Sequence, residues 1–252
     1  MSRSNNSNNR SKKQRRNEVL QETELYERQY HTPPAKVRPK SIEAKTDKQQ
    51  KYINSIRDKV ITFGVGPAGT GKTYIAASIA ADMLESKEIE RIIITRPAVE
   101  AGESLGFLPG DESEKYAPYI APFLDVLNER LGKGKVEYLL KTGKISAEPF
   151  AYMRGKTFKD AFVILDEAQN ATKTQMKLFL TRIGENSRVV IDGDVEQADI
   201  RDSGLADAVN RLSYIPSVGV VKFGDGDIVR SGIVAEIIQA YRQEPLGKAI
   251  LG

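Results

Sequence analysis

The sequence has 252 residues and contains no cysteine, no tryptophan and one histidine, His31. Without cysteine there can be no disulfide, thiolate zinc site or cysteine nucleophile. A single histidine cannot form a histidine metal cluster, and we assign no function to His31 because it stands near Pro33 and Pro34 in a linker. Any metal ion must therefore be bound by oxygen atoms.

Long apolar runs are also missing. No stretch approaches the roughly 18 apolar residues that a membrane-spanning helix needs, and no apolar segment follows the charged N-terminus. These absences predict a cytoplasmic protein without a membrane partner. The composition, 40% hydrophobic and 29% charged residues, suits a single core, and single cores stop growing near ~250 to 300 residues.

Positive charge is concentrated at the N-terminus. Residues 1–40 carry ten basic and four acidic side chains, a net charge of +6, whereas the remaining residues sum to −2. Residues 1–16 are rich in Asn and Ser and have too few apolar side chains to order themselves. We therefore predict a disordered basic tail and linker over residues 1–40 and a single domain over residues 41–252. The cations of the tail either bind nucleic-acid phosphates or remain solvated without a partner.

Short β-rich runs alternate with helical patterns from residue 45 onward. The runs lie at residues 60–65, 91–95, 162–165, 188–191 and 218–223. Apolar residues at helical spacing follow two of them, at Ile75, Ile79 and Met83 and at Met176, Phe179, Leu180 and Ile183. Thr172 and Gln175 have the spacing of a capping box at the start of the second of these helices.

This alternation predicts an α/β fold with a mainly parallel sheet that is covered by helices on both faces. Ligands of such sheets bind beyond the C-terminal ends of the strands. Residues 101–158 are longer and less regular than one crossover connection, which indicates an insertion with its own helices.

The strongest chemical signal is the segment Gly66-Pro67-Ala68-Gly69-Thr70-Gly71-Lys72-Thr73, which matches the pattern GxxxxGK[ST]. It follows a β run and opens a helix, so backbone N–H groups and a helix N-terminus face the phosphates of a bound nucleotide. Lys72 is then expected to reach the β and γ phosphates, and the Thr73 hydroxyl to be a ligand of Mg²⁺. With Tyr74, this segment is our candidate nucleotide-binding loop.

Two adjacent acids follow the buried run at 162–165. Asp166 is expected to hold Mg²⁺ through water, and Glu167, whose side chain points differently, is expected to orient and deprotonate the attacking water. A third strand end, at residues 189–194, leads to Gln197, whose amide can hydrogen-bond the γ phosphate or the attacking water and report hydrolysis. The alternative for this segment is a solvated acidic turn. A water-activating Glu favours hydrolysis over phosphoryl transfer to a small molecule.

These motifs, together with Gly193-Asp194-x-x-Gln197 and the string that runs from Thr95-Arg96-Pro97 to Gly110, resemble the PhoH family. The family comprises phosphate-starvation-inducible ATPases akin to one RecA-like lobe of superfamily 1 helicases, and the resemblance covers about residues 45–241. It implies a RecA-like P-loop fold and ATP hydrolysis with Mg²⁺. It also implies RNA or other single-stranded nucleic acid as a partner, and a homo-oligomeric ring of six subunits.

The resemblance further implies roles for individual residues. Thr46, Gln49 and Tyr52 would lie in a segment that recognises adenine, and either Gln49 or Gln50 would be the amide that reads the base. Arg96 would contact the nucleic-acid backbone at the end of its strand. The alternative for Arg96 is an ordinary insertion loop.

Two other candidates come from spacing and from chain length. Tyr152, Arg154 and Lys156 share one face if their segment is extended, where an aromatic ring stacks on a base and cations bind phosphate; a half-buried strand is the alternative. The chain has room for one lobe only, so a neighbouring subunit would have to supply the arginine that stabilises the γ-phosphate transition state. Arg230 is our candidate, with a salt-bridged surface arginine as the alternative.

The sequence therefore predicts a Mg²⁺-dependent ATPase that binds or remodels RNA or single-stranded nucleic acid, and helicase activity is compatible with this prediction. One alternative is a P-loop kinase of a small molecule or nucleotide. The other is a nucleotide-gated binding module with negligible turnover. Phosphate release measured with and without RNA separates the three.

Overall fold

A computed structural model describes residues 41–97, 112–148, 150–153, 155–197, 200, 202–229 and 237 of the chain. All of them belong to the unit Ser41–Gly252. The predicted basic tail, residues 1–40, lies outside the described residues, as does most of the string from Arg96 to Gly110.

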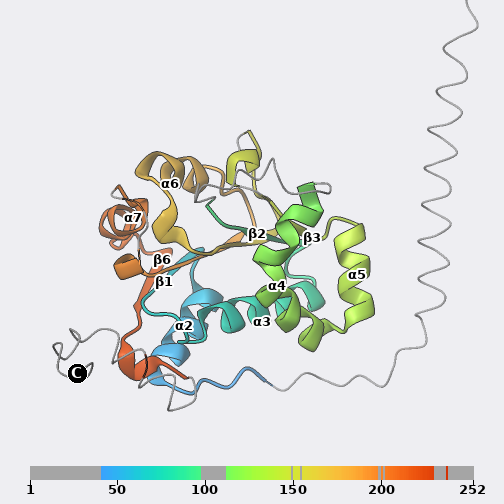
Figure 1. Ribbon diagram of the computed structural model, residues 1–252, viewed down its shortest axis with the longest axis horizontal. Helices are drawn as coiled ribbons and strands as arrows, with labels where there is room; N and C mark the ends of the chain where they lie inside the picture. The colour runs from blue at the N-terminus through green and yellow to red at the C-terminus, as the bar shows by residue number, and fades with distance from the viewer. Residues whose placement is uncertain are drawn as a thin grey trace, which may run out of the picture. The chain divides into compact units, whose positions relative to one another are not determined.

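The centre of the fold is a sheet of six parallel strands in the order β3-β2-β4-β5-β1-β6 (Figure 1). The strands are β1 (Ile61–Val65), β2 (Arg91–Thr95), β3 (Ile145–Ala147), β4 (Ala161–Leu165), β5 (Arg188–Gly193) and β6 (Val218–Lys222). In β4 every residue is buried, which is typical of a strand covered on both faces. Because the strands are parallel, the segments after β1, β2, β4 and β5 all leave from one edge of the sheet.

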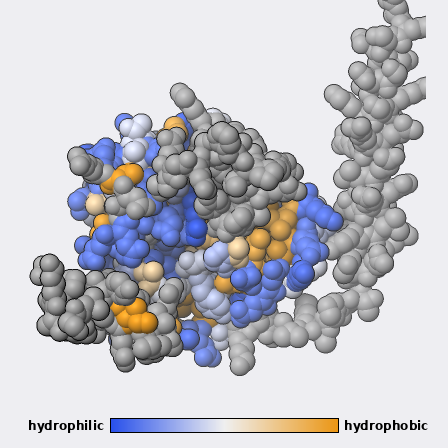
Figure 2. All heavy atoms as spheres, in the orientation of Figure 1, coloured by the Kyte–Doolittle hydropathy of each residue, from blue (hydrophilic) through white to orange (hydrophobic). Residues whose placement is uncertain are grey.

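Helices cover both faces of this sheet (Figure 1). One face packs against α2 (Asp47–Asp58), α3 (Lys72–Glu85), α4 (Glu112–Leu131) and α5 (Lys133–Lys141), and the other against α6 (Lys173–Leu180) and α7 (Gly204–Leu212). The two apolar clusters between these layers are built mainly from Ile, Val, Leu and Phe side chains. On the face shown in Figure 2, most of the described residues are hydrophilic, as expected when the apolar side chains are enclosed.

The predicted α/β fold is confirmed, with strands at all five predicted runs. The capping box is also present, because the Thr172 hydroxyl accepts from the Gln175 N–H while the Gln175 side chain accepts from the Thr172 N–H. Helix α6 ends at Leu180, however, so Ile183 of the predicted stripe lies beyond the helix, in a bridge with Phe158. Among the strands and α-helices, the three-residue strand β3 and the helices α2 and α7 were not predicted.

The stretch at residues 101–158 contains α4 and α5, as an insertion with its own helices would, and it also supplies the edge strand β3. None of the helices among the described residues is both long and apolar enough to cross a membrane.

Candidate functional site

The segment between β1 and α3 forms a phosphate-binding loop. Its glycines Gly66, Gly69 and Gly71 all have positive φ angles, of 142°, 84° and 85°, a backbone region that side chains other than glycine rarely adopt. Gly71 is also the N-cap of α3, and it offers no side-chain cap, whereas Thr46 and Thr172 cap α2 and α6. The first N–H groups of α3 therefore have no capping side chain, a condition that suits a helix N-terminus to binding an anion.

Lys72, the first residue of α3, folds its side chain over this loop. Its Nζ donates to the carbonyl oxygens of Gly66 and Pro67 at 2.7 and 2.8 Å and to the Thr70 hydroxyl at 3.3 Å. Burial lowers the pKa of Lys72, and the nearby carboxylates of Asp192, Asp194, Asp166 and Glu167 oppose this by raising it. Four acids therefore act electrostatically on one lysine, at the place where a polyphosphate would bind.

The other predicted loop residues surround this lysine. Pro67 and Thr70 are buried, and Ala68 is exposed at the tip. Thr73 is the second residue of α3. Tyr74 is 41% exposed, and its hydroxyl is 3.4 Å from Glu129 Oε1 on α4, so Tyr74 points toward α4.

Helix α2 supports the loop through Gln49. The Gln49 Nε2 donates to the Thr70 carbonyl at 2.9 Å, and its Oε1 accepts from the Lys45 N–H at 2.7 Å. Thr46 caps the same helix by accepting from the Gln49 N–H. Gln50 instead donates to Asn54 on the exposed side of α2. Of the two glutamines, Gln49 is therefore the one that lies against the loop.

Asp166 follows β4 and is 7% exposed. Its Oδ2 accepts from Arg96 Nε at 2.9 Å and from Arg96 Nη2 at 2.5 Å. Asp166 and Thr73 both offer oxygen atoms, the ligand type that Mg²⁺ prefers. The charge of the Asp166 carboxylate also raises the pKa of Lys72, the residue before Thr73, so the carboxylate acts electrostatically on the start of α3. The residues present thus fit a Mg²⁺ ion whose remaining ligands are water and phosphate oxygens, and which would neutralise charge on the phosphates.

Glu167 has a left-handed backbone, with φ 53°, a conformation that costs a non-glycine residue roughly 1–3 kcal/mol and is concentrated at functional sites. Its Oε2 accepts from Gln169 Nε2 at 2.7 Å. The Gln169 Oε1 in turn accepts from the Asp194 N–H at 3.0 Å. Gln169 is 2% exposed, so a buried amide connects the acid after β4 with the turn after β5.

Gln169 was not predicted to have a role of its own. The sequence signal that was available is the glycine at position 193. Gly193 lies beside Gln169 in space, and a Cβ at this position would lie 2.6 Å from Gln169 Oε1. Gln197 stands in the 3-10 turn Val195–Gln197 and donates from Nε2 to Asp194 Oδ2 at 2.8 Å. Gln169 and Asp194 therefore link Gln197 to Glu167.

Tyr52 does not lie where an adenine base could reach it. Its side chain is fully buried under β1, and its hydroxyl donates to Asp192 Oδ1 at 2.5 Å. Its ring packs edge-on against Phe223, at 5.4 Å between centroids, and Lys72 Nζ lies 5.8 Å from that same Phe223 ring. The prediction that Tyr52 takes part in a segment that recognises adenine is wrong for this residue, because its side chain is fully buried against Phe223 and Asp192.

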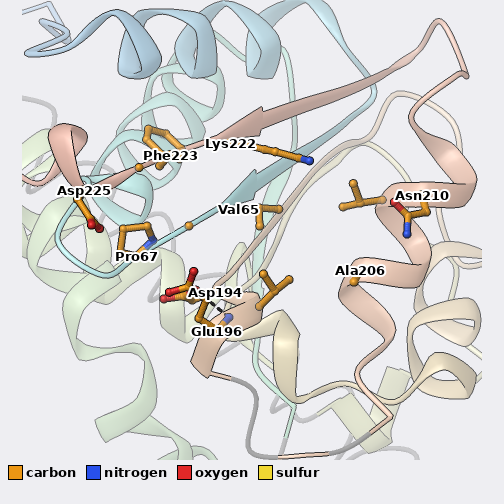
Figure 3. A pocket seen from close by; sticks show the side chains of 13 residues that line it. Val65, Pro67, Asp194, Glu196, Ala206, Asn210, Lys222, Phe223 and Asp225 are labelled. Atoms are coloured by element: carbon orange, nitrogen blue, oxygen red, sulfur yellow. Dashed lines mark hydrogen bonds between the residues drawn. The ribbon is translucent and has the colours of Figure 1, made fainter. Parts of the chain in front are cut away.

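Beside the loop lies a pocket of about 420 Å³ (Figure 3). The ends of β1 and β6, the turn after β5 and helix α7 form its walls. Figure 3 shows Asp194 and Asp225 near Pro67 at one end and Lys222 and Asn210 at the other. The phosphate loop thus borders open space on the side of α7.

The structure changes the interpretation of the segment around Tyr152. Residues Phe150–Met153 form a 3-10 helix, so the prediction of one extended face is wrong. The physical reason is burial, because Phe150 and Met153 both face the apolar cluster and a 3-10 turn brings residues three apart to one side. Lys156 is exposed and donates to Glu148 Oε2 at 2.8 Å. Arg154 and the side chain of Tyr152 lie outside the described residues.

Arg230 also lies outside the described residues, but the residue before it does not. The Val229 N–H donates to the Gly69 carbonyl at 3.0 Å. The chain leading to Arg230 is therefore attached to the phosphate loop of its own subunit.

Comparison with known proteins agrees with this geometry. A family model described as PhoH-like protein matches residues 41–242. The chain is 48% identical over 227 residues to the PhoH-like protein of Bacillus subtilis (strain 168), which covers 88% of this chain and 71% of that protein. It is 49% identical over 205 residues to Protein PhoH of Escherichia coli (strain K12), which covers 79% of this chain and 58% of that protein.

A solved structure, the large terminase from a thermophilic bacteriophage, is similar with a TM-score of 0.48 and 12% identity over 79% of this chain and 51% of that chain.

The family model spans most of the chain and includes every motif of the site, from Gln49 to Gln197. The chain therefore belongs to the PhoH family, and its glycine-rich loop is the P-loop of a parallel α/β nucleotide-binding fold.

Proposed function

We propose that this chain hydrolyses ATP with Mg²⁺ and that RNA or another single-stranded nucleic acid stimulates the reaction. The observation that carries the proposal is the convergence of an uncapped P-loop helix, Lys72 and the acids Asp166 and Glu167 at one edge of the sheet. A P-loop alone binds phosphate, whereas an oriented carboxylate beside it gives the means to activate water.

Each side chain then has a distinct task. Lys72 exchanges the carbonyl oxygens of Gly66 and Pro67 for oxygens of the β and γ phosphates, because both kinds of oxygen accept from its ammonium group. Glu167 accepts the proton of the attacking water, and the bond from Gln169 fixes the direction of its carboxylate. Through Gln169 and Asp194, the position of Glu167 is linked to Gln197.

The nucleic-acid part of the proposal depends on Arg96. This residue stands at the C-terminal end of β2, its side chain is 21% exposed, and it contacts the acid that we assign to Mg²⁺. A guanidinium group in such a position is suited to binding a backbone phosphate. The family resemblance supports RNA as the ligand and a ring of six subunits as the assembly.

The decisive experiment measures phosphate release, with and without a single-stranded RNA oligonucleotide, in the wild type and two variants. Lys72→Ala should lose hydrolysis and bind nucleotide more weakly. Glu167→Gln should bind ATP nearly as well as the wild type but turn over at least ~100-fold more slowly, since a general base contributes about 10² to 10⁴. Lys59→Ala is the matched control, because Lys59 also donates to a carbonyl, that of Pro216, but at the opposite end of β1.

Equal turnover in the wild type and Glu167→Gln would remove Glu167 from the reaction. Phosphate that appears on an added acceptor instead of in solution would show a kinase. Tight ATP binding without phosphate release, with or without RNA, would show a binding module.

A further inference from the structure

Arg96 and Asp166 meet because of the strand register. Thr95 at the end of β2 pairs with Leu165 at the end of β4, and the Asp166 N–H donates to the Thr95 carbonyl at 2.9 Å. The next residues on the two strands are therefore Arg96 and Asp166, side by side. Their ion pair is a direct consequence of two neighbouring parallel strands that end at the same level.

Asp166 and Phe123 both lie close to the guanidinium group. Its Nε and Nη2 both donate to Asp166 Oδ2, and its Cζ lies 6.0 Å from the centroid of the Phe123 ring of α4. Phe123 is fully buried, whereas the Arg96 side chain is 21% exposed and that of Asp166 is 10% exposed. A solvent-borne phosphate can therefore reach Arg96 more easily than it can reach Asp166.

The contact places two cations in competition for one carboxylate. A Mg²⁺ ion needs the charge of Asp166, while Arg96 neutralises that charge through two hydrogen bonds and repels a second cation nearby. A phosphodiester group competes in the opposite sense, because its oxygens accept from the same guanidinium N–H groups. A ligand that binds Arg96 therefore makes the Asp166 carboxylate more available to the metal ion.

We infer that Arg96 is the positioning residue that transmits nucleic-acid binding to the metal site: it holds Asp166 when no nucleic acid is bound, and a backbone phosphate draws it away and leaves Asp166 to Mg²⁺. This inference rests on the proposed function for its second half, the release by nucleic acid. Its first half, the hold on Asp166, depends only on the ion pair.

The hold is tested without RNA and without turnover. Mn²⁺, as a spectroscopic substitute for Mg²⁺, is titrated into the complex of the full chain with ADP, and bound Mn²⁺ is measured by electron paramagnetic resonance. Arg96→Gln should bind Mn²⁺ about tenfold more tightly than the wild type. A factor of ten corresponds to the lower end of the free energies of hydrogen bonds to charged groups, and the lower end applies because the ion pair is partly exposed. Arg96→Lys, which keeps the charge but loses the two-pronged contact, should fall between them.

Arg211→Gln is the matched control, since Arg211 forms an ion pair with Asp207 on the exposed side of α7. It should bind Mn²⁺ as the wild type does. Weaker or unchanged Mn²⁺ binding by Arg96→Gln and Arg96→Lys overturns the inference. Weaker binding would mean that Arg96 orients Asp166 for the metal.

The release is tested by repeating the titration with a single-stranded RNA oligonucleotide whose binding is followed separately by fluorescence anisotropy. RNA should tighten Mn²⁺ binding by the wild type toward the value of Arg96→Gln and should leave that variant unchanged. RNA that binds the wild type without changing Mn²⁺ affinity overturns the coupling while the proposed function stands. RNA that does not bind at all overturns both the coupling and the nucleic-acid part of the proposed function, and the titration without RNA still decides whether Arg96 holds Asp166.

Discussion

Asp192 should make the stability of this protein depend on pH near neutrality. Its carboxyl group is fully buried in β5, where Oδ1 accepts from the Tyr52 hydroxyl and Oδ2 has no hydrogen-bond partner among the described residues. Burial raises the pKa of Asp192 from 3.8 to about 7, although the bond from Tyr52 and the charge of Lys72 lower it, and Asp166 and Glu167 add to the rise. The folded protein therefore keeps a proton that the unfolded chain has already lost.

The sign and size follow from these two pKa values. A raised pKa in the folded state gives a contribution to stability that is complete below about pH 3.8 and is lost as the pH rises to about 7. A tenfold change in acidity corresponds to about 1.4 kcal/mol, so ionising Asp192 in the folded state costs about 4 kcal/mol in total. Asp192→Asn removes this titration and keeps an oxygen that accepts from Tyr52. The NH₂ group of the new amide, which takes the place of Oδ2, lowers the free energy of unfolding by an amount that does not depend on pH.

Urea unfolding of the wild type and Asp192→Asn from about pH 5 to about pH 8 tests this. The free energy of unfolding of the wild type, relative to the variant, should fall by about 2 kcal/mol between pH 5 and pH 7 and level off by about pH 8. Asp58→Asn, at the exposed end of α2, should follow the wild type at every pH. A wild-type-minus-variant difference that stays constant from pH 5 to pH 8 would refute the reasoning, because it would mean that Asp192 does not titrate in this range.

Three further predictions concern the site and its partners. Gln169→Met keeps the buried volume but loses the bond to Glu167, so kcat for ATP should fall about 10- to 100-fold with little change in KM. Deleting residues 1–16 removes six cations, so if they bind RNA, the slope of log K against log salt should become shallower by up to about 4; an unchanged slope means that the tail is inert. Lys72→Ala and Arg230→Ala should each be nearly inactive, yet mixed and reassembled subunits should recover part of the ATPase, whereas no recovery despite subunit exchange would exclude action of Arg230 on a neighbouring subunit.

The strands and the P-loop could be predicted because their signals are local. A run such as 162–165 is apolar throughout, and burial on both faces of a sheet requires that composition. The glycines of the loop stand at fixed spacing because the backbone there needs positive φ angles. Helix α2 was missed since its sequence is mostly polar, although Thr46 at the N-cap and the spacing of Ile53 and Ile56 were available signals.

The environment of Asp192 could not be predicted, because it depends on residues far apart in the chain. The predicted strand at 188–191 stops one residue before Asp192, which puts the acid in the segment that leads from the strand end to Gln197. The observed β5 continues to Gly193 and carries Asp192 into the sheet. The neighbouring strand permits this only through Gly64, since a Cβ there would overlap both Asp192 Oδ1 and the Tyr52 ring. A buried carboxyl is tolerated when a donor satisfies it, and that donor, Tyr52, comes from α2. The hydrogen-bonded pair of Tyr52 and Asp192 therefore requires three features together: a glycine in β1, a β5 that is longer than predicted, and the unpredicted helix α2. No single segment of the sequence signals that combination.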